Sequence, residues 1–301
     1  MTDIMPLSDR SSWLPDHLRR LTAAYRANGL TEAAATAMVE RGRERAEDWQ
    51  AAEIVADGRR VGLVAAGVVT ENGTTTGRIG ILRLDPAAGG TDRDRLAARD
   101  WAEGWCAERG ARQVFVALTE PDTLFDDYGV RGQNRVKPVG IAPTPAEGLT
   151  GRPMTAAEYP VWRAAQEAEY TADIIRAGAL DPDQARAKSA QDFARLLPDG
   201  LASTGHAILV LENGGRTVGT GWLLHGFLPG VTFGYSLEVH PEHRGNGHGR
   251  GAMTVGELAT AAAGDQALML NVFGGNEVAM NLYTSTGYRV LEEHRSRELT
   301  G

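Results

Sequence analysis

The pattern of apolar and polar positions predicts a chain that begins with two helices and continues with strands. Apolar residues recur at helical spacing over residues 14–28 and 31–48, after which short alternating or β-branched runs replace that spacing. Turn-rich segments join these runs, so we expect an antiparallel meander. The first half then holds strands over 51–57, 59–69 and 78–86, a helix over 92–109, a strand over 113–118 and a short helix near 121–128.

The second half repeats this order of elements. Its first helix carries Thr155 and Glu158 at the spacing of a capping box, a motif that marks the start of a helix. The expected elements are helices over 155–178 and 182–197, strands over 206–212, 216–224 and 232–241, a helix over 249–263, a strand over 267–273 and a helix over 277–286.

Three short sequence matches between the halves share nearly one offset, at 157, 155 and 158 residues. The matched stretches are Val61-Gly62 with Val218-Gly219, Leu84-Asp85-Pro86 with Val239-His240-Pro241, and Leu124-Phe125-x-x-x-Gly129 with Leu282-Tyr283-x-x-x-Gly287. Any single match would be chance. Together, in the same order of elements, they indicate a tandem repeat of one α/β fold.

The length and composition of the chain suit two globular domains. The chain has 301 residues, of which 42 % are hydrophobic, which is enough material for two cores. A segment rich in Pro and Gly, without hydrophobic periodicity, separates the repeats and is typical of a linker. We therefore expect a first domain over 1–140, a linker over 141–154 and a second domain over 155–301.

The net charge and the cysteine content limit which cellular compartment and which kinds of binding partner are expected. The formal net charge is −8, with no basic face in either half, so we expect no nucleic-acid partner. Neither a signal peptide nor a run of about eighteen apolar residues is found, so we expect a cytoplasmic protein without a membrane segment. The single cysteine, Cys106, excludes an internal disulfide framework and lies in a predicted amphipathic helix, where a buried structural thiol is expected.

A glycine-rich stretch lies between the strand that ends near Val239 and the next helix. Four glycines alternate from Gly245 to Gly251, flanked by Arg244 and Arg250. Glycine lets the backbone approach a ligand closely, and the N–H groups of the first helical turn attract an anion. Arginine adds charge-assisted hydrogen bonds to phosphate oxygens. The stretch therefore predicts a site for a phosphate or pyrophosphate group.

Two common nucleotide motifs fit this stretch poorly. A dinucleotide fingerprint is formally present from Gly247 to Ala252, but the next strand does not end in an acidic residue, and too little chain remains for a doubly wound sheet. A Walker loop is excluded because no Lys-Ser or Lys-Thr follows the glycines.

A pair of motifs in the second half resembles the GNAT superfamily, the acyl-CoA-dependent N-acyltransferases. The coenzyme A pyrophosphate loop of this family matches Arg244-x-x-Gly247-x-Gly249, which follows a strand here as it does there. The family's downstream motif, an Asn followed by a helix, matches Asn276 and Leu282-Tyr283-x-x-x-Gly287-Tyr288. The resemblance covers residues 155–297, and the weaker repeat extends it to the first half. It implies an α/β (α+β) fold of two tandem GNAT-like domains, each a mostly antiparallel mixed sheet flanked by helices.

The resemblance also implies roles for individual residues. The backbone of Leu237 and Val239 would bind the pantetheine arm, with the Val239 N–H polarising the thioester carbonyl. Asn276 would contact the cofactor, and Tyr283 would protonate the departing thiolate, a role that suits a phenol. The pyrophosphate loop would consist of Arg244, Gly245, Asn246, Gly247, His248, Gly249 and Arg250.

The general base is less well defined than the acid. Strict alternation along the strand would place Tyr235, Leu237 and Val239 on one face and Glu238 on the other. Glu238 is the candidate base, and a solvated strand residue is an equally good interpretation. The histidines of the loop lack a recognised metal-ligand spacing, so we expect no metal site.

The first repeat differs from the second at the positions that carry chemistry. Its counterpart of the phosphate loop, Asp85–Asp100, is acidic, and its counterpart of Tyr283 is Phe125, which has no hydroxyl group. We therefore expect a degenerate first domain that has lost cofactor binding and serves a structural role or walls off part of the acceptor cleft.

These observations lead to one functional expectation and one rival. The resemblance implies an acetyltransferase that moves an acetyl group from acetyl-CoA to a primary amine of a small molecule or peptide by direct attack. We expect a monomer or homodimer. The alternative is a non-catalytic acyl-CoA sensor or interaction protein, against which the presence of Tyr283 argues.

Overall fold

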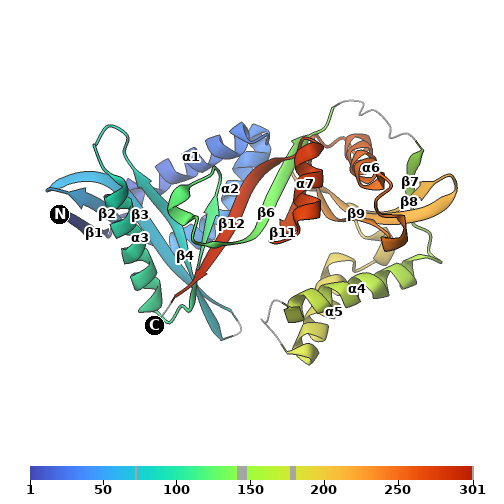
Figure 1. Ribbon diagram of the computed structural model, residues 1–301, viewed down its shortest axis with the longest axis horizontal. Coiled ribbons are helices and arrows are strands. Elements are labelled where there is room, and N and C mark those ends of the chain that lie inside the picture. Colours follow the sequence, from blue (N-terminus) through green and yellow to red (C-terminus); the bar gives the residue numbers. More distant parts are fainter. Residues whose placement is uncertain (72, 141–147, 177–180, 300–301) are drawn as a thin grey trace. The chain divides into compact units, whose positions relative to one another are not determined.

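The computed structural model describes the whole chain except residues 72, 141–147, 177–180 and 300–301. Backbone contacts divide the chain into two units (Figure 1). Unit 1 consists of Met1–Lys137 and Asn271–Gly301, and unit 2 consists of Pro138–Leu270. The structure thus differs from the expected division, because the C-terminal segment belongs to the unit formed by the first half.

Unit 1 is built on one mixed sheet with the strand order β1-β2-β3-β4-β5-β12-β6. Its neighbouring strands run antiparallel except β4 and β5, which are parallel. The strands are β1 (Thr2–Leu7), β2 (Gln50–Ala56), β3 (Arg59–Glu71), β4 (Thr74–Leu84), β5 (Gln113–Leu118), β6 (Gly129–Pro138) and β12 (Arg289–Glu298). The helices are η1 (Arg10–Ser12), α1 (Leu14–Ala27), α2 (Glu32–Glu47), α3 (Asp92–Ala107), η2 (Thr123–Phe125) and α7 (Glu277–Ser285).

Unit 2 repeats the part of this arrangement that β1–β5 form, with the strand order β11-β10-β9-β8-β7. Here β10 and β11 are the parallel pair, and the other neighbours run antiparallel. The strands are β7 (Leu149–Pro153), β8 (His206–Asn213), β9 (Arg216–Leu228), β10 (Val231–Val239) and β11 (Ala267–Phe273). The helices are α4 (Tyr159–Arg176), α5 (Pro182–Leu196), η3 (Gly200–Ala202), η4 (Pro241–His243) and α6 (His248–Ala262).

The expected fold class is confirmed, since each unit is a mostly antiparallel mixed sheet flanked by helices. Most of the expected helices and strands are present, with ends shifted by a few residues. Part of the expected linker differs: Leu149–Pro153 forms the edge strand β7, which pairs with β8. Residues 141–147 of that linker lie outside the described residues. Strands β1, β6 and β12 are further elements that the apolar pattern did not reveal.

Close helix–sheet packing explains one glycine and the lone cysteine of unit 1. Helix α3 buries Cys106 completely, and a Cβ atom at Gly77 of β4 would lie 2.7 Å from the Cys106 Cβ atom. Only glycine therefore lets α3 approach the strand this closely. Burial raises the pKa of the Cys106 thiol to about 11, so this cysteine is a structural thiol, as expected, rather than a nucleophile.

Unit 2 has an aromatic core on one face of its sheet and a helix on the other. Trp222 of β9 meets Trp162 of α4 edge to face at a centroid distance of 5.6 Å and Phe193 of α5 at 5.3 Å. On the opposite face, α6 lies against β10, where a Cβ atom at Gly256 would be 3.1 Å from the Leu237 side chain. The two faces of β10 therefore meet different environments.

An extra residue interrupts the pairing of the fourth strand of each repeat. Between the pairs Gly234↔Leu223 and Ser236↔Trp222, β10 contains one additional residue, Tyr235, which shifts the register. Between the pairs Ile79↔Ala66 and Ile81↔Ala65, β4 has Gly80 in the same role. The two bulges are 155 residues apart, the offset of one of the sequence matches. The repeat therefore extends to an irregularity in the backbone.

The bulge corrects the expected alternation along β10. Tyr235 stacks on Trp222 at a centroid distance of 4.5 Å, whereas Leu237 packs against Gly256 of α6. Tyr235 and Leu237 therefore lie on opposite faces, because the extra residue shifts the period of two by one position. Glu238 pairs with Thr220, two residues before Trp222, so it shares the face of Tyr235.

We predict that Tyr25→Phe destabilises the protein because Tyr25 links the N-terminal and C-terminal segments of unit 1. The Tyr25 hydroxyl, on α1, donates a hydrogen bond to the buried Glu292 carboxylate of β12. Its loss leaves part of a buried charge unsatisfied and should lower the free energy of unfolding by about 1.5–3 kcal/mol. Urea denaturation measures this change.

The matched control for this experiment is Tyr170→Phe. The Tyr170 hydroxyl also donates to a carboxylate, Asp192, at 3.0 Å, but that carboxylate keeps the Lys188 ammonium as a partner. This change should cost less than about 1 kcal/mol. Equal effects of the two substitutions would contradict the role given to the Tyr25–Glu292 contact.

Candidate functional site

The glycine-rich loop leads from β10 into a helix whose N-terminus has no internal cap. Gly245 and Gly247 have backbone φ angles of +80° and +79°, which residues other than glycine rarely adopt. Gly247 is the N-cap of α6. No side chain caps this helix, and its first turn holds no acidic residue. The first N–H groups of α6 and its positive dipole end can therefore serve an external anion.

The equivalent helix of unit 1 differs at this point. Thr91 and Asp94 form a capping box at the start of α3, and the Asp94 carboxylate accepts hydrogen bonds from the Thr91 N–H and hydroxyl at 2.8 and 2.7 Å. Hydrogen bonds from Thr2 and Thr91 lower the pKa of Asp94, which keeps the carboxylate ionised. The N-terminus of α3 thus already holds a negative charge from its own chain.

Polar side chains of the loop of unit 2 are turned toward its backbone or remain exposed. The Arg244 guanidinium donates to the Val239 carbonyl oxygen at 3.0 Å and lies 3.6 Å from the Glu238 carboxylate. The Asn246 amide donates to the carbonyl groups of His243 and Arg244 at 3.3 Å. Arg250 is exposed. Both arginines of the loop are accessible, since the Arg244 side chain is 60 % exposed.

Strand β10 presents different groups on its two faces. Leu237 packs toward α6, while Glu238 lies on the face that carries Tyr235 and Trp222. The Ser236 hydroxyl on this second face is buried and has no hydrogen-bond partner among the described residues. A carboxylate, a hydroxyl and two stacked aromatic rings therefore share one side of the strand, where they can contact a polar or cationic ligand.

The second predicted motif lies on α7, in unit 1. Asn276 is the N-cap of this helix, and its side-chain oxygen accepts a hydrogen bond from the Ala279 N–H at 3.1 Å. The capping role gives this residue a structural purpose of its own, while its exposed amide N–H₂ group stays available. The motif is therefore explained in part by helix formation alone.

Tyr283 lies in the middle of α7 and is partly buried. Its ring lies 5.9 Å from that of Tyr288. Burial raises the pKa of the Tyr283 phenol, and the positive charge of Arg135 acts in the opposite direction. Tyr283 is therefore a protonated phenol at neutral pH, the state required of a proton donor.

The structure groups the predicted site residues in two places. Leu237, Glu238 and Val239 and the loop residues Arg244–Arg250 belong to one strand–loop–helix segment of unit 2. Asn276 and Tyr283 share one helix of unit 1. Sequence reasoning missed Arg135, because a buried arginine on a polar strand has no recognisable pattern, and it missed the face shared by Glu238 and Trp222, because the bulge is not visible in the sequence.

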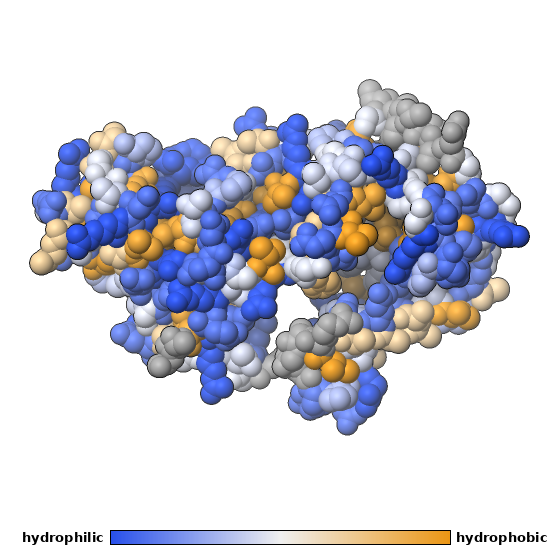
Figure 2. All heavy atoms as spheres, in the orientation of Figure 1, coloured by the Kyte–Doolittle hydropathy of each residue, from blue (hydrophilic) through white to orange (hydrophobic). Residues whose placement is uncertain are grey.

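Apolar side chains are exposed next to the Asn276 motif. Phe273 and Val278 are 65 % and 82 % exposed. On the face shown in Figure 2, apolar residues form small groups among hydrophilic ones. Single exposed apolar residues of this kind are ordinary on a protein surface.

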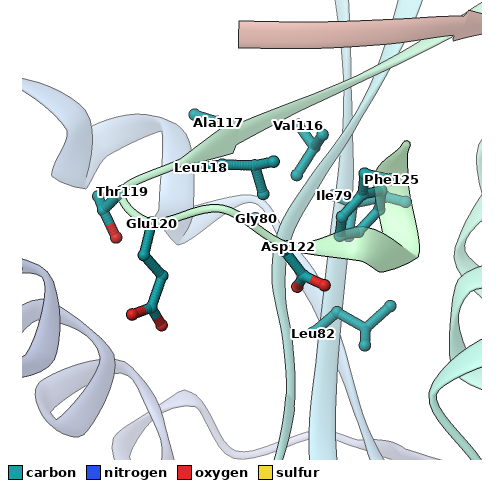
Figure 3. A pocket seen from close by; sticks show the side chains of 10 residues that line it. All are labelled: Ile79, Gly80, Leu82, Val116, Ala117, Leu118, Thr119, Glu120, Asp122 and Phe125. Carbon is teal, nitrogen blue, oxygen red and sulfur yellow. The ribbon is translucent and has the colours of Figure 1, made fainter. Parts of the chain in front are cut away.

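Unit 1 has a small cleft where β4 and β5 part (Figure 3). The parallel pairing of these strands covers only Gly77–Ile79 with Val114–Val116. Beyond it lies a cavity of about 150 Å³, lined by Ile79, Gly80, Leu82, Val116, Ala117, Leu118, Thr119, Glu120, Asp122 and Phe125. Phe125, the counterpart of Tyr283, is 2 % exposed and belongs to the hydrophobic core of the unit. The residue of this cleft that corresponds to Tyr283 therefore lacks a hydroxyl group.

In the part of the chain that the structure describes, no group of three or more His, Cys, Asp or Glu side chains could hold a metal ion. No helix within the described ranges is both long and apolar enough to cross a membrane.

Comparisons with known proteins agree with the motifs. Residues 172–288 match the acetyltransferase (GNAT) family. Two uncharacterized N-acetyltransferases of Bacillus subtilis (strain 168) are similar. YycN is 28 % identical over 151 residues, covering 49 % of this chain and 96 % of YycN. YdgE is 27 % identical over 149 residues, covering 48 % of this chain and 95 % of YdgE.

One solved structure resembles the whole chain in fold. The crystal structure of a GCN5-related N-acetyltransferase from Sphaerobacter thermophilus aligns with a TM-score of 0.55 and 18 % identity, covering 100 % of this chain and 96 % of that one. At this identity the likeness concerns the fold alone.

Proposed function

We propose that this chain, whose residues 172–288 match the acetyltransferase (GNAT) family, transfers an acetyl group from acetyl-CoA to a primary amine of a small molecule or peptide. The observation that carries the proposal is the N-terminus of α6, which has a glycine N-cap and no acidic residue in its first turn. This end of the helix is suited to a pyrophosphate group, whereas the same end of α3 is filled by Asp94.

The loop residues fit coenzyme A by their chemistry. Backbone N–H groups from Gly245 to Gly249 and the guanidinium groups of Arg244 and Arg250 would hold the pyrophosphate. The backbone of Leu237 and Val239 would bind the pantetheine arm, and the Asn276 amide would contact it. When bound, acetyl-CoA supplies an activated acetyl group and a thiolate leaving group. The Val239 N–H would donate a hydrogen bond to the carbonyl oxygen as negative charge develops there.

The acceptor nitrogen loses two protons on its way from ammonium to amide, and the leaving sulfur gains one. The ammonium must lose its first proton before it can act as a nucleophile, and we assign this step to the Glu238 carboxylate. Once the C–N bond has formed and the C–S bond breaks, the Tyr283 hydroxyl donates its proton to the departing sulfur and the nitrogen releases its second proton to water, which leaves an amide and a thiol. No covalent intermediate with the enzyme is needed.

The environment of Glu238 supports its assignment as the base. The carboxylate lies on the same face of β10 as Tyr235 and Trp222. Helix α6 packs on the other face of the strand. Its one ion-pair partner among the described residues is Arg244, at 3.6 Å. A pyrophosphate group that engages Arg244 would compete with the Glu238 carboxylate for this guanidinium.

We propose that the first repeat is a degenerate domain with a structural role. Its helix α3 carries its own carboxylate where the pyrophosphate would sit, and Phe125 replaces the proton donor. A second coenzyme A would have to displace the Asp94 cap and meet its negative charge. One cofactor site per chain follows from this difference.

Isothermal titration calorimetry with coenzyme A tests the cofactor site. We expect one site per chain, and Arg250→Gln should weaken binding about tenfold because it removes one charge-assisted contact to phosphate. Arg186→Gln is the matched control, since Arg186 is an arginine of α5 with a 63 % exposed side chain paired only with Asp183. Two sites per chain, or equal weakening in both variants, would contradict the assignment.

Steady-state kinetics of Tyr283→Phe test the proton donor. Release of coenzyme A is followed with a panel of primary amines, from polyamines to aromatic amines and short peptides, and kcat should fall about a hundredfold with the best acceptor. Affinity for coenzyme A should not change. Because burial raises the pKa of Tyr283, the wild-type rate should decline only at strongly alkaline pH, and this decline should be absent in the variant. Unchanged turnover would remove Tyr283 from the mechanism.

A further inference from the structure

A buried arginine of the first half lies beside the helix of the proposed proton donor. Arg135, on β6, is 6 % exposed. Its Nη1 group donates a hydrogen bond to the Thr284 hydroxyl at 2.8 Å, and Thr284 follows Tyr283 directly in α7. Both residues lie in unit 1. Arg135 therefore fixes α7 at the turn that carries the phenol.

The remaining contacts of Arg135 are with a neutral side chain. Its Nε and Nη2 groups donate to the Gln133 side-chain oxygen at 2.9 and 2.7 Å. The Gln133 amide in turn donates to the Glu293 carboxylate at 2.6 Å, but Arg295 already pairs with that carboxylate at 2.5 Å. None of the ion pairs among the described residues includes Arg135. The guanidinium is held by hydrogen bonds without a carboxylate of its own.

A buried cation without an adjacent carboxylate is costly, so its presence calls for a reason. Packing alone would be served by an apolar side chain of similar volume. Burial lowers the pKa of Arg135, and the charge of Glu293 and the Tyr283 phenol act against this effect. The groups that sense the charge are thus a carboxylate shared with Arg295 and the proposed proton donor.

We propose that Arg135 is a positioning residue for the proton donor, holding α7 through Thr284 and placing a positive charge at the turn of the helix that carries the Tyr283 phenol. The inference rests on the proposed function. When the Tyr283 O–H bond breaks, the proton goes to the thiolate sulfur and a phenolate remains. The Arg135 charge stabilises this phenolate until water returns a proton to it. The first half of the chain thus contributes to the reaction through β6, although its own repeat is degenerate.

Other charged and titratable groups also lie near helix α7. Lys137 of β6 lies 5.6 Å above the Tyr288 ring, and Tyr288 lies next to Tyr283. Glu293 of β12 reaches Arg135 only through Gln133. Because these groups are unchanged in a variant of Arg135, a change in the titration of Tyr283 reports on the Arg135 charge itself.

The test compares Arg135→Gln and Arg135→Lys with Arg131→Gln. Arg131 is an exposed arginine of the same strand that donates to the Ser296 hydroxyl at 2.5 Å, so its variant controls for a lost arginine on β6. In Arg135→Gln we expect kcat to fall about tenfold at an unchanged KM for acetyl-CoA. The alkaline decline of kcat should move up by about one pH unit, because the phenol holds its proton more tightly. Arg135→Lys should restore the position of the decline.

A second measurement keeps the inference testable without turnover. The chain has seven tyrosines, and ¹³C labelling of their rings lets the Tyr283 signal be identified by its loss in Tyr283→Phe. In a pH titration by NMR, this signal should titrate at higher pH in Arg135→Gln than in the wild type and Arg131→Gln. Thr284→Val, which removes the hydrogen bond and keeps the charge, should leave the titration in place.

The possible results distinguish a failure of the role proposed for Arg135 from a failure of the proposed proton donor. An unmoved Tyr283 titration in Arg135→Gln, or the same movement in Thr284→Val, overturns the role of the Arg135 charge. A shifted titration in a protein whose turnover does not depend on Tyr283 refutes the proposed proton donor while the electrostatic coupling stands. A lower kcat with no shift of the alkaline decline assigns Arg135 to packing alone and overturns the inference.

Discussion

One extra residue in β10 determines how the candidate site is arranged. Because Tyr235 is an additional residue in the register with β9, every later side chain of the strand points to the face opposite to the one that strict alternation gives. Leu237 then fills the space at Gly221 and Gly256, which ties α6 to the sheet. Glu238 turns to the aromatic face instead. Without the bulge, the candidate base would lie under α6 and an apolar side chain would face the acceptor.

The same irregularity in β4 has a different consequence, because the following segment has different chemistry. Gly80 takes the place of Tyr235, since the Trp49 ring occupies the position that a Cβ atom would need. Beyond Gly80, strands β4 and β5 separate and leave a cleft. Helix α3 then begins with a capping box, whereas α6 begins with glycine. The backbone of the repeat is retained, and the charge at one helix N-terminus distinguishes the proposed cofactor site from a closed helix end.

The sequence predicts those parts of the fold that depend on burial against a single hydrophobic face. Helices such as α3 and strands such as β5 have clear periodicity, and both were predicted nearly to the residue. Strand β6 has none, because its interior residues Gln133, Asn134 and Arg135 pair with polar partners on β12 and α7 rather than with apolar ones. A strand whose polar groups satisfy one another cannot be recognised from hydrophobic spacing alone.

The candidate site, like the fold, could be predicted from the sequence only in part. The positive φ angles of Gly245 and Gly247 and the cap at Asn276 follow from the residue types, so the loop and the start of α7 were predictable. The face of Glu238 was not, since a bulge depends on how two strands register rather than on either sequence. The proposed role of Arg135 was not predictable either, because it depends on a contact with Thr284, a residue distant in the chain.

The proposed proton donor has to satisfy two opposing requirements. It must remain protonated at neutral pH, which burial ensures by raising the pKa of Tyr283. It must also release that proton to a thiolate, a weaker base than a phenolate in water, so an unaided buried phenol would hold its proton too tightly. A nearby positive charge is the physical means of easing release without exposing the phenol to solvent. Arg135 is a buried cation whose guanidinium contacts Thr284, at the turn of α7 that carries the phenol.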